Sequence, residues 1–146
     1  MLAYVFWHRP AGDVEREDYE ARLRAFHATL GVPSACFRLH LLPWRHADGY
    51  EDWYLVEDWA ALGELNAAAV APAHRAEHDA AAAWAAEGWG GVYALVHGEP
   101  VPPQAARWAR APEDGAEGVW RRQMVLGPAP EYCLTGGEPH GRVRIT

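Results

Sequence analysis

The chain has 146 residues, half of them hydrophobic, and a formal net charge of −7. This length suits one domain with a hydrophobic core, and the apolar content excludes a disordered chain. The negative charge and the lack of a basic stripe argue against a nucleic-acid partner, because binding a phosphate backbone normally needs a basic face. Lysine is absent, which excludes Schiff-base and P-loop chemistry.

The composition is typical of a cytoplasmic protein. The first residues lack the basic head of a secretory signal. The alanine-rich stretch 67–86 carries several charged side chains, so we expect no membrane span there. Two cysteines, Cys36 and Cys133, do not make a disulfide framework, and we expect them to be reduced, buried and packed as small apolar side chains.

The predicted elements begin with a strand at residues 2–9, which are rich in aromatic and aliphatic side chains and are followed by Pro10. A helix follows, because apolar residues recur at helical spacing. Asp13 is positioned to cap this helix and Gly31 to end it. The inward stripe of the helix consists of Tyr19, Leu23, Phe26 and Leu30.

Two further strands are predicted at 35–42 and 51–56, joined through a turn at Asp48-Gly49. Asp58 then caps a helix that begins at Trp59. This helix is interrupted at Pro72.

A second helical piece spans 73–87, and residues 88–91 form a loop before a fourth strand at 92–97. The order strand, helix, strand, strand, helix, strand predicts an α+β fold of the ferredoxin-like βαββαβ type. In such a fold both helices cover one face of an antiparallel sheet.

Alternation along the strands divides the predicted sheet into two faces. We assign a wholly apolar face to the helices; it carries Val5, Trp7, Phe37, Leu39, Leu41, Trp53, Leu55, Val92 and Val96. The other face is mixed but too apolar to stand in water, and it carries Tyr4, Phe6, His8, Cys36, Arg38, His40, Tyr54, Val56, Tyr93, Leu95 and His97. A second sheet packed on this face would bury it, which predicts a two-fold homodimer.

The chain is divided into a ferredoxin-like domain at 1–98 and a C-terminal extension at 99–146. Residues 99–117 are rich in Pro, Ala, Glu and Gly and are predicted to be a linker. Residues 119–126 are predicted to form a strand and 131–135 a short return strand. This extension is too small to fold alone, so we expect it to dock on the body or on a partner subunit.

The first strand and helix carry a family resemblance. Trp7-His8-Arg9-Pro10, followed by Tyr19 and by Phe26-His27-Ala28-Thr29-Leu30, resembles EthD-like proteins of the dimeric α/β-barrel superfamily. That superfamily also includes antibiotic-biosynthesis-type monooxygenases and NIPSNAP-like proteins. The resemblance covers residues 2–98, and the extension after Gly98 departs from the short members.

The resemblance implies a dimeric α/β barrel that holds a small apolar or aromatic ligand between sheet and helices, with haem in some members. His27 matches the late histidine of EthD-like helices. It is therefore the candidate catalytic residue, as a general base or a haem ligand. The alternative is a boundary histidine with one satisfied nitrogen, and both interpretations stay open here.

The remaining candidates are ligand-binding residues. Trp44 and Trp84 lie near loops or helix ends, where a tryptophan is suited to a pocket wall or a dimer seam. His78 is expected at the edge of the pocket. His8 and Tyr54 complete the predicted ligand-binding set, from the mixed face of the sheet.

His74 to His78 fits the His-x-x-Glu-His pattern of inverted zinc peptidases. Two histidines four residues apart on a helix can hold one metal ion. The pattern is short and no third ligand is indicated, so a solvated helix face is the preferred interpretation and we assign no metal ligand. The identity of any cofactor is left open.

Three hypotheses about function follow. The first is a small-molecule enzyme or binding protein whose aromatic-lined pocket takes an aromatic or polyketide-like compound, with proton transfer or cofactor-free oxygenation as the natural chemistry. The second is a non-catalytic dimeric binding or structural module. The third is a metal-binding protein that uses His74 and His78.

Overall fold

The computed structural model describes the backbone of residues 1–146 and every side chain except that of Leu126. It is an α+β fold, as predicted. In chain order its elements are β1 (Leu2–Pro10), α1 (Arg16–Thr29), β2 (Ser34–Leu39), β3 (Gly49–Val56), α2 (Trp59–Ala69), α3 (Arg75–Ala82), β4 (Ala85–His97), β5 (Ala106–Ala109), β6 (Gly118–Leu126), β7 (Tyr132–Thr135) and β8 (Arg142–Arg144).

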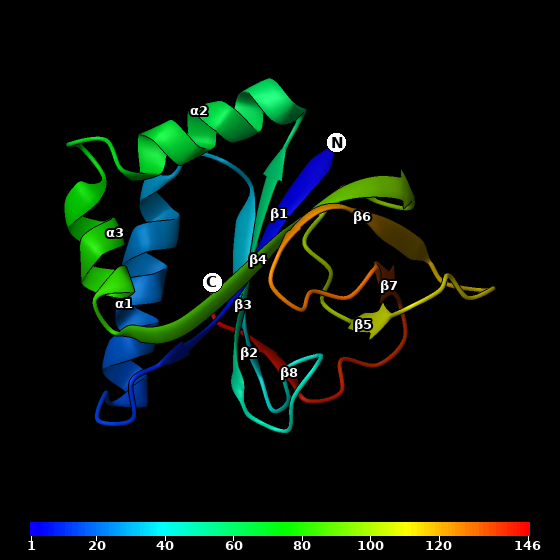
Figure 1. Cartoon of the computed structure of the whole chain (residues 1–146), viewed down its shortest axis with the longest axis horizontal. Coiled ribbons are helices and arrows are strands. Elements are labelled where there is room, and N and C mark those ends of the chain that lie inside the picture. The colour runs from blue at the N-terminus through cyan, green and yellow to red at the C-terminus, as the bar shows by residue number, and fades with distance from the viewer.

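The strands form one antiparallel sheet in the order β5-β7-β6-β4-β1-β3-β2-β8. The three helices lie on one side of this sheet, and β5, β6 and β7 curl away on the other side (Figure 1). The curl follows from the handed twist of strands, which accumulates across so many neighbours. The sheet therefore has a helix-covered face and a concave face.

The helix-covered face is held by two apolar clusters. One packs Tyr54 and Val56 of β3 against Leu65 of α2 and Leu30 after α1. The other packs Tyr19 and Leu23 of α1 against Cys36 and Tyr50. The stripe predicted for α1 is therefore present, with Tyr19 and Leu23 buried and facing the sheet.

The concave face holds the largest buried side chains. Trp7, Trp53 and Trp120 are fully buried there and form one cluster with Phe37 and Tyr93. The ring of Trp120, on β6, lies 5.6 Å from that of Trp53 on β3. The extension of the same chain thus covers the face opposite the helices.

The predicted assignment of the two faces is wrong for β1, β2 and β3. Val5 and Phe37 face the concave side, and Tyr4 and Tyr54 face the helices. Alternation shows which residues share a face, but both faces here are largely apolar, so it does not show which face takes the helices. The mixed face, on which the predicted dimer depended, is covered by the chain's own helices and gives no reason for a second copy.

The extension adds strands at both edges of the central sheet. β6 pairs with β4, and β7 and β5 follow outward, while β8 pairs with β2 at the other edge. Two of these strands, β5 and β8, were missed: 106–109 lies inside the predicted linker, and β8 has only three residues. Both are too short for an alternation pattern to stand out.

β4 begins seven residues earlier than predicted, at Ala85 instead of Val92. Glycines are unfavourable inside strands, but here aromatic rings lie directly over them. A Cβ atom at Gly88 would lie 2.5 Å from the ring of Phe6, and one at Gly91 would lie 2.8 Å from the ring of Tyr93. The glycines therefore let neighbouring rings pack flat on the strand.

The predicted helix caps had different outcomes. Asp58 caps α2, since its side chain accepts a hydrogen bond from the backbone N–H of Ala61 at 2.9 Å. Asp13 does not cap α1, because the helix begins later and Glu15 occupies its N-cap position without a side-chain hydrogen bond. Both Cys36 and Cys133 are free and buried, as expected.

Among the described helices, none combines the length and the apolar character needed to cross a membrane.

Replacing Trp120 with Ala tests whether the extension is part of the core. The side chain is fully buried against Trp53, so we expect the free energy of unfolding to fall by about 3–5 kcal/mol in urea titrations followed by circular dichroism. Val96→Ala, at a position that is 60% exposed, should change it by less than about 0.5 kcal/mol. A loss below about 1 kcal/mol for Trp120→Ala would contradict a shared core.

Candidate functional site

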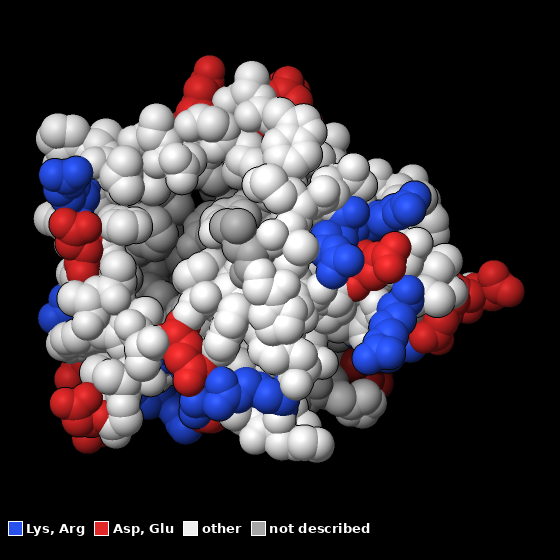
Figure 2. Space-filling view, viewed as in Figure 1, with Lys and Arg blue, Asp and Glu red and all other residues white. Residues whose placement is uncertain are grey.

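A cavity of about 560 Å³ lies between the helices and the sheet. In Figure 2 this side of the molecule is hollowed between the helical part and the sheet, and the atoms around the hollow are mostly uncharged. Its walls are aromatic and aliphatic side chains from β1, α1, α2 and β4, among them Tyr4, Phe6, Phe26, Leu62, Leu65 and Val92. A small apolar molecule matches such walls.

Two aromatic rings that line the cavity lie over glycines of β4. The ring of Phe6 lies over Gly88, and that of Tyr4 lies over Gly90, where a Cβ atom would be 3.0 Å from it. β1 and β4 are paired so that Phe6 is opposite Gly90 and Tyr4 is opposite Val92. The rings can therefore lean along the sheet, which leaves open space beneath the helices.

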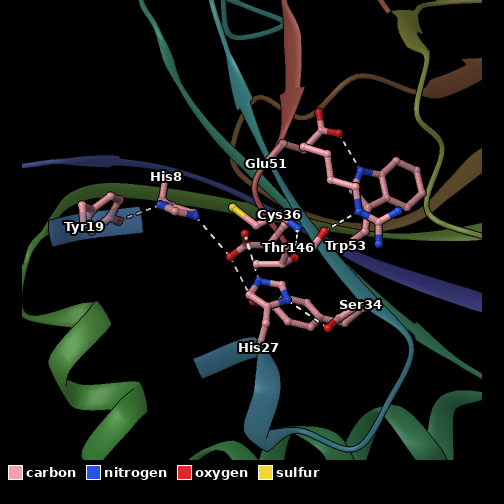
Figure 3. Close-up of polar contacts among 11 residues, drawn as sticks. His8, Tyr19, His27, Ser34, Cys36, Glu51, Trp53 and Thr146 are labelled. Carbon is pink, nitrogen blue, oxygen red and sulfur yellow. Dashed lines mark hydrogen bonds and ion pairs between the residues drawn. The ribbon is translucent and has the colours of Figure 1, made fainter. Parts of the chain in front are cut away.

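The cavity has one polar wall, formed by Tyr19 of α1, His8 of β1 and Asp52 of β3. Tyr19 Oη lies 2.7 Å from His8 Nδ1, and His8 Nε2 lies 3.1 Å from Asp52 Oδ2. Each nitrogen of the His8 ring is thus hydrogen-bonded to a neighbouring side chain, Nδ1 to Tyr19 and Nε2 to Asp52 (Figure 3). All three residues are at most 3% exposed.

Asp52 continues the polar chain on its other side. Tyr54 donates to Asp52 Oδ2 at 2.9 Å, and His27 Nε2 lies 3.3 Å from Asp52 Oδ1. The far nitrogen of His27 is 2.9 Å from the hydroxyl of Ser34, at the start of β2. Figure 3 shows the resulting line of side chains, which runs from Tyr19 through His8 and His27 to Ser34.

Asp52 is the charged centre of this series of hydrogen-bonded side chains. Burial alone would raise the pKa of Asp52, but the electrostatic interactions and hydrogen bonds with His8 and His27 outweigh burial and hold the pKa well below its ordinary value of 3.8. Burial, and next the charge of Asp52, raise the pKa of Tyr19 and of Tyr54 well above 10. The carboxylate is therefore ionised, and both tyrosines keep their protons.

These charge states fix the direction of the hydrogen bonds. An ionised carboxylate only accepts, so His8 donates to it through Nε2–H. In the neutral imidazole the other nitrogen, Nδ1, then accepts the proton of the Tyr19 hydroxyl. A carboxylate, an imidazole and a hydroxyl in series are the arrangement that proteins use to move protons at a site.

The structure places the predicted site residues in three groups. His8, Tyr54 and His78 line the cavity. His27 is 6% exposed and lies behind Asp52 and Tyr54, so the predicted polar group of the pocket is not at the cavity surface.

The two predicted tryptophans lie elsewhere. Trp44 packs edge-on against Trp7 at 5.0 Å and against Trp89 at 5.4 Å, next to the concave face. Trp84 is covered by the guanidinium of Arg22, 3.6 Å from its ring centre. Neither side chain lines the cavity, because each packs against other residues at the margin of the fold.

Sequence reasoning missed Asp52 and took Tyr19 for an ordinary core residue. A signal for Asp52 was present: acidic residues are depleted in strands, yet Glu51-Asp52 stands in the middle of a strand whose eight residues are all buried. Tyr19 offers no comparable signal, since a tyrosine on an apolar stripe packs in the same way with or without a functional hydroxyl partner.

One group of buried side chains has the spacing of metal ligands. His8, Cys36 and Asp52 each place one ligand atom within 4.8 Å of the others. Both nitrogens of His8 are already paired, and burial, with the charge of Asp52, raises the pKa of the Cys36 thiol well above 9. A metal ion would need the thiolate and a free nitrogen, so the geometry favours a hydrogen-bonded site.

The predicted pair His74 and His78 lies in the first turn of α3 and at its N-cap. His74 stands at the N-cap of α3 and is not in its helical turns. His78 Nδ1 lies 3.0 Å from Asp79 Oδ1. Metal binding by this pair remains a prediction.

Comparison with protein-family models, with curated proteins and with solved structures found no match to this chain.

The Asp52→Asn variant tests the charge at the centre of the site. Replacing the carboxylate by an amide leaves the imidazoles of His8 and His27 without their negative partner. We therefore expect the free energy of unfolding at pH 7 to fall by about 3 kcal/mol. The contribution of Asp52 is present above about pH 4 and is lost as the pH falls, because the unfolded chain takes up this proton first.

Urea titrations of both proteins between neutral and acid pH measure the effect. The difference between wild type and Asp52→Asn should shrink as the pH falls below about 4. Asp13→Asn, at an exposed position, is the matched control and should leave the curve unchanged. Equal stability of Asp52→Asn and wild type at pH 7 would contradict an ionised, paired Asp52.

Proposed function

We propose that this chain is a small-molecule enzyme that holds an apolar, aromatic or polyketide-like compound in the cavity and moves a proton to or from it. The observation that carries the proposal is an apolar cavity of about 560 Å³ with one polar wall, where Tyr19, His8 and Asp52 are hydrogen-bonded in series. An apolar cavity with a few convergent polar groups is the usual form of a small-molecule site.

The proposed mechanism uses two protonation states of His8. When His8 is neutral, the Tyr19 hydroxyl donates to Nδ1 and is turned away from the cavity. When His8 is protonated, Nδ1–H donates to the Tyr19 oxygen, and the hydroxyl proton is free to donate to a ligand oxygen. Tyr19 can then pass its proton to the ligand while it receives one from His8, and the reverse sequence removes a proton.

This relay does not need a tyrosinate at any stage. The raised pKa of Tyr19 disfavours its ionised form, so concerted transfer through the hydroxyl is the favoured route. Asp52 is the orienting group, because its carboxylate accepts the Nε2 proton and offsets the charge of a protonated His8. Enolisation next to a carbonyl group is the reaction class that this relay can serve, because a proton leaves or returns to the ligand through the Tyr19 hydroxyl while His8 gains or loses one.

His27 is assigned a positioning role instead of the catalytic role predicted from the sequence. It lies 3.3 Å from Asp52 and 2.9 Å from the Ser34 hydroxyl. Ser34 is only partly buried. His27 and Ser34 therefore hold Asp52 in place and give the buried polar groups a hydrogen-bonded path toward the surface.

We further propose that residues 1–98 are a ferredoxin-like unit related to the dimeric α/β-barrel superfamily. Support comes from the strand order β4-β1-β3-β2 and from helices on a single face. In this proposal residues 99–146 take the place of the second subunit, because β5 to β7 cover the concave face. The proposed chemistry does not depend on a homodimer.

A non-catalytic binding module is the second candidate. The observation that favours it is the burial of Tyr19 and His8, at 1% and 2% exposed, with both of their hydrogen bonds made inside the protein. In that case the cavity would bind a ligand and the polar wall would only orient it.

Exchange of the α-protons of 2-tetralone in D2O, followed by proton NMR, tests the proposal without knowledge of the natural substrate. We expect the wild-type protein to accelerate the exchange. His8→Gln should lose at least about tenfold of this acceleration, because general acid and base groups contribute about 10²–10⁴-fold. Gln can keep a hydrogen bond to Asp52, so the variant should remain folded.

His97→Gln, at an exposed position on β4, is the matched control and should exchange at the wild-type rate. Binding of 2-tetralone without accelerated exchange would instead support the binding module. Acceleration that survives in His8→Gln would exclude the His8 relay.

A further inference from the structure

The concave face contains a buried carboxylate with four donors. Glu51 is fully buried. Its Oε2 accepts from the indole N–H groups of Trp7 at 2.8 Å and Trp108 at 2.7 Å, and its Oε1 accepts from Trp53 at 2.5 Å. Arg142 Nη1 also donates to Oε1, at 2.5 Å. Each oxygen of this carboxylate therefore accepts two hydrogen bonds.

Arg142 is not satisfied in the same way. Its side chain is 4% exposed and its guanidinium lies 3.6 Å from the centre of the Phe37 ring. Within the described part of the chain, Nε and Nη2 have no hydrogen-bond acceptor. These two nitrogens share one edge of the guanidinium, opposite the Nη1 that serves Glu51. That edge presents two parallel N–H donors, the fork to which a carboxylate binds.

A second cavity, of about 450 Å³, lies at this residue. Arg142 lines it together with apolar side chains of the β2–β3 connection and β5, chiefly Leu41, Leu42, Pro43 and Trp108. His40, His140 and Arg107 also line it, and none of the described lining residues is acidic. Arg107 already pairs with Glu113, so Arg142 supplies the uncompensated donors.

We propose that this second cavity binds a small carboxylic acid with an apolar body. The two carboxylate oxygens would accept from Nε–H and Nη2–H of Arg142, and the apolar part would lie against Leu41, Leu42 and Trp108. The planar fork matches a carboxylate better than a phosphate, which usually attracts several cationic groups. Because both nitrogens are closed to solvent, binding requires a small shift of the groups that cover this edge, and the interaction that then forms is shielded from water.

This site is separate from the proposed proton-transfer site. Glu51 and Asp52 are consecutive on β3, so their side chains point to opposite faces of the sheet. Asp52 belongs to the helix-covered cavity, and Glu51 anchors Arg142 on the concave face. The carboxylate site would stand even if the proposed enzymatic function were wrong.

Calorimetric titration with benzoate and with its neutral isostere benzamide tests the proposal. We expect benzoate to bind to the wild-type protein at least about tenfold more tightly than benzamide, because a charged hydrogen-bond pair is lost in the amide. Arg142→Lys keeps the charge but removes the fork, and it should weaken benzoate binding by about tenfold or more. Arg144→Lys, on the same strand and outside the cavity, is the matched control.

Leu41→Trp gives a second test that does not disturb the buried ion pair. Leu41 lines the cavity and is 57% exposed, so the larger ring should fill the cavity without unfolding the protein and should weaken benzoate binding. Val143→Trp, at an exposed position outside the cavity, should not weaken it.

Several results would overturn the carboxylate site. They are no benzoate binding at millimolar concentration, equal binding of benzoate and benzamide, and full benzoate affinity in Leu41→Trp. Inorganic phosphate that competes as well as benzoate would also overturn it, because the site would then be a general anion site without selection for an apolar acid.

Discussion

Two consecutive buried carboxylates on β3 constrain the rest of this structure. A buried carboxylate is costly unless it is paired and hydrogen-bonded, so Glu51 and Asp52 each need donors on their own face of the sheet. Glu51 obtains them from three indoles and Arg142, and Asp52 obtains them from His8, His27 and Tyr54. The donors come from β1, α1, β3, β5 and β8, and therefore tie both ends of the chain to the central strand.

The two faces serve different purposes because they are covered by different kinds of structure. Three helices lie over the Asp52 face. They leave a cavity because the aromatic rings of β1 lie flat against glycines of β4 and do not fill the space beneath the helices. The extension lies over the Glu51 face as strands, and its tryptophans fill the concave side. The proposed proton relay and the proposed carboxylate site are thus separated by the sheet itself, although their anchoring residues are neighbours in the chain.

Much of the central fold could be predicted from local patterns. The stripe of Tyr19 and Leu23, the Asp58 cap and the alternation in β1 to β3 each depend on residues close in sequence, and each is present. The errors arose where a distant partner decides the outcome. The strand at Ala85–Gly91 exists because rings from β1 and from β4 itself cover its glycines, and β5 exists because β7 pairs with it.

By itself, the sequence determined the α+β class, the order of the central elements and the residues that share a face. Those properties follow from short-range periodicity, capping and turn chemistry. The tertiary structure alone decided which face takes the helices and which residues form the polar wall. Asp52, His8 and Tyr19 meet only after three elements pack, and the pairing of Glu51 with Arg142 joins residues 91 positions apart. Such contacts depend on register and chain path, which a local pattern does not contain.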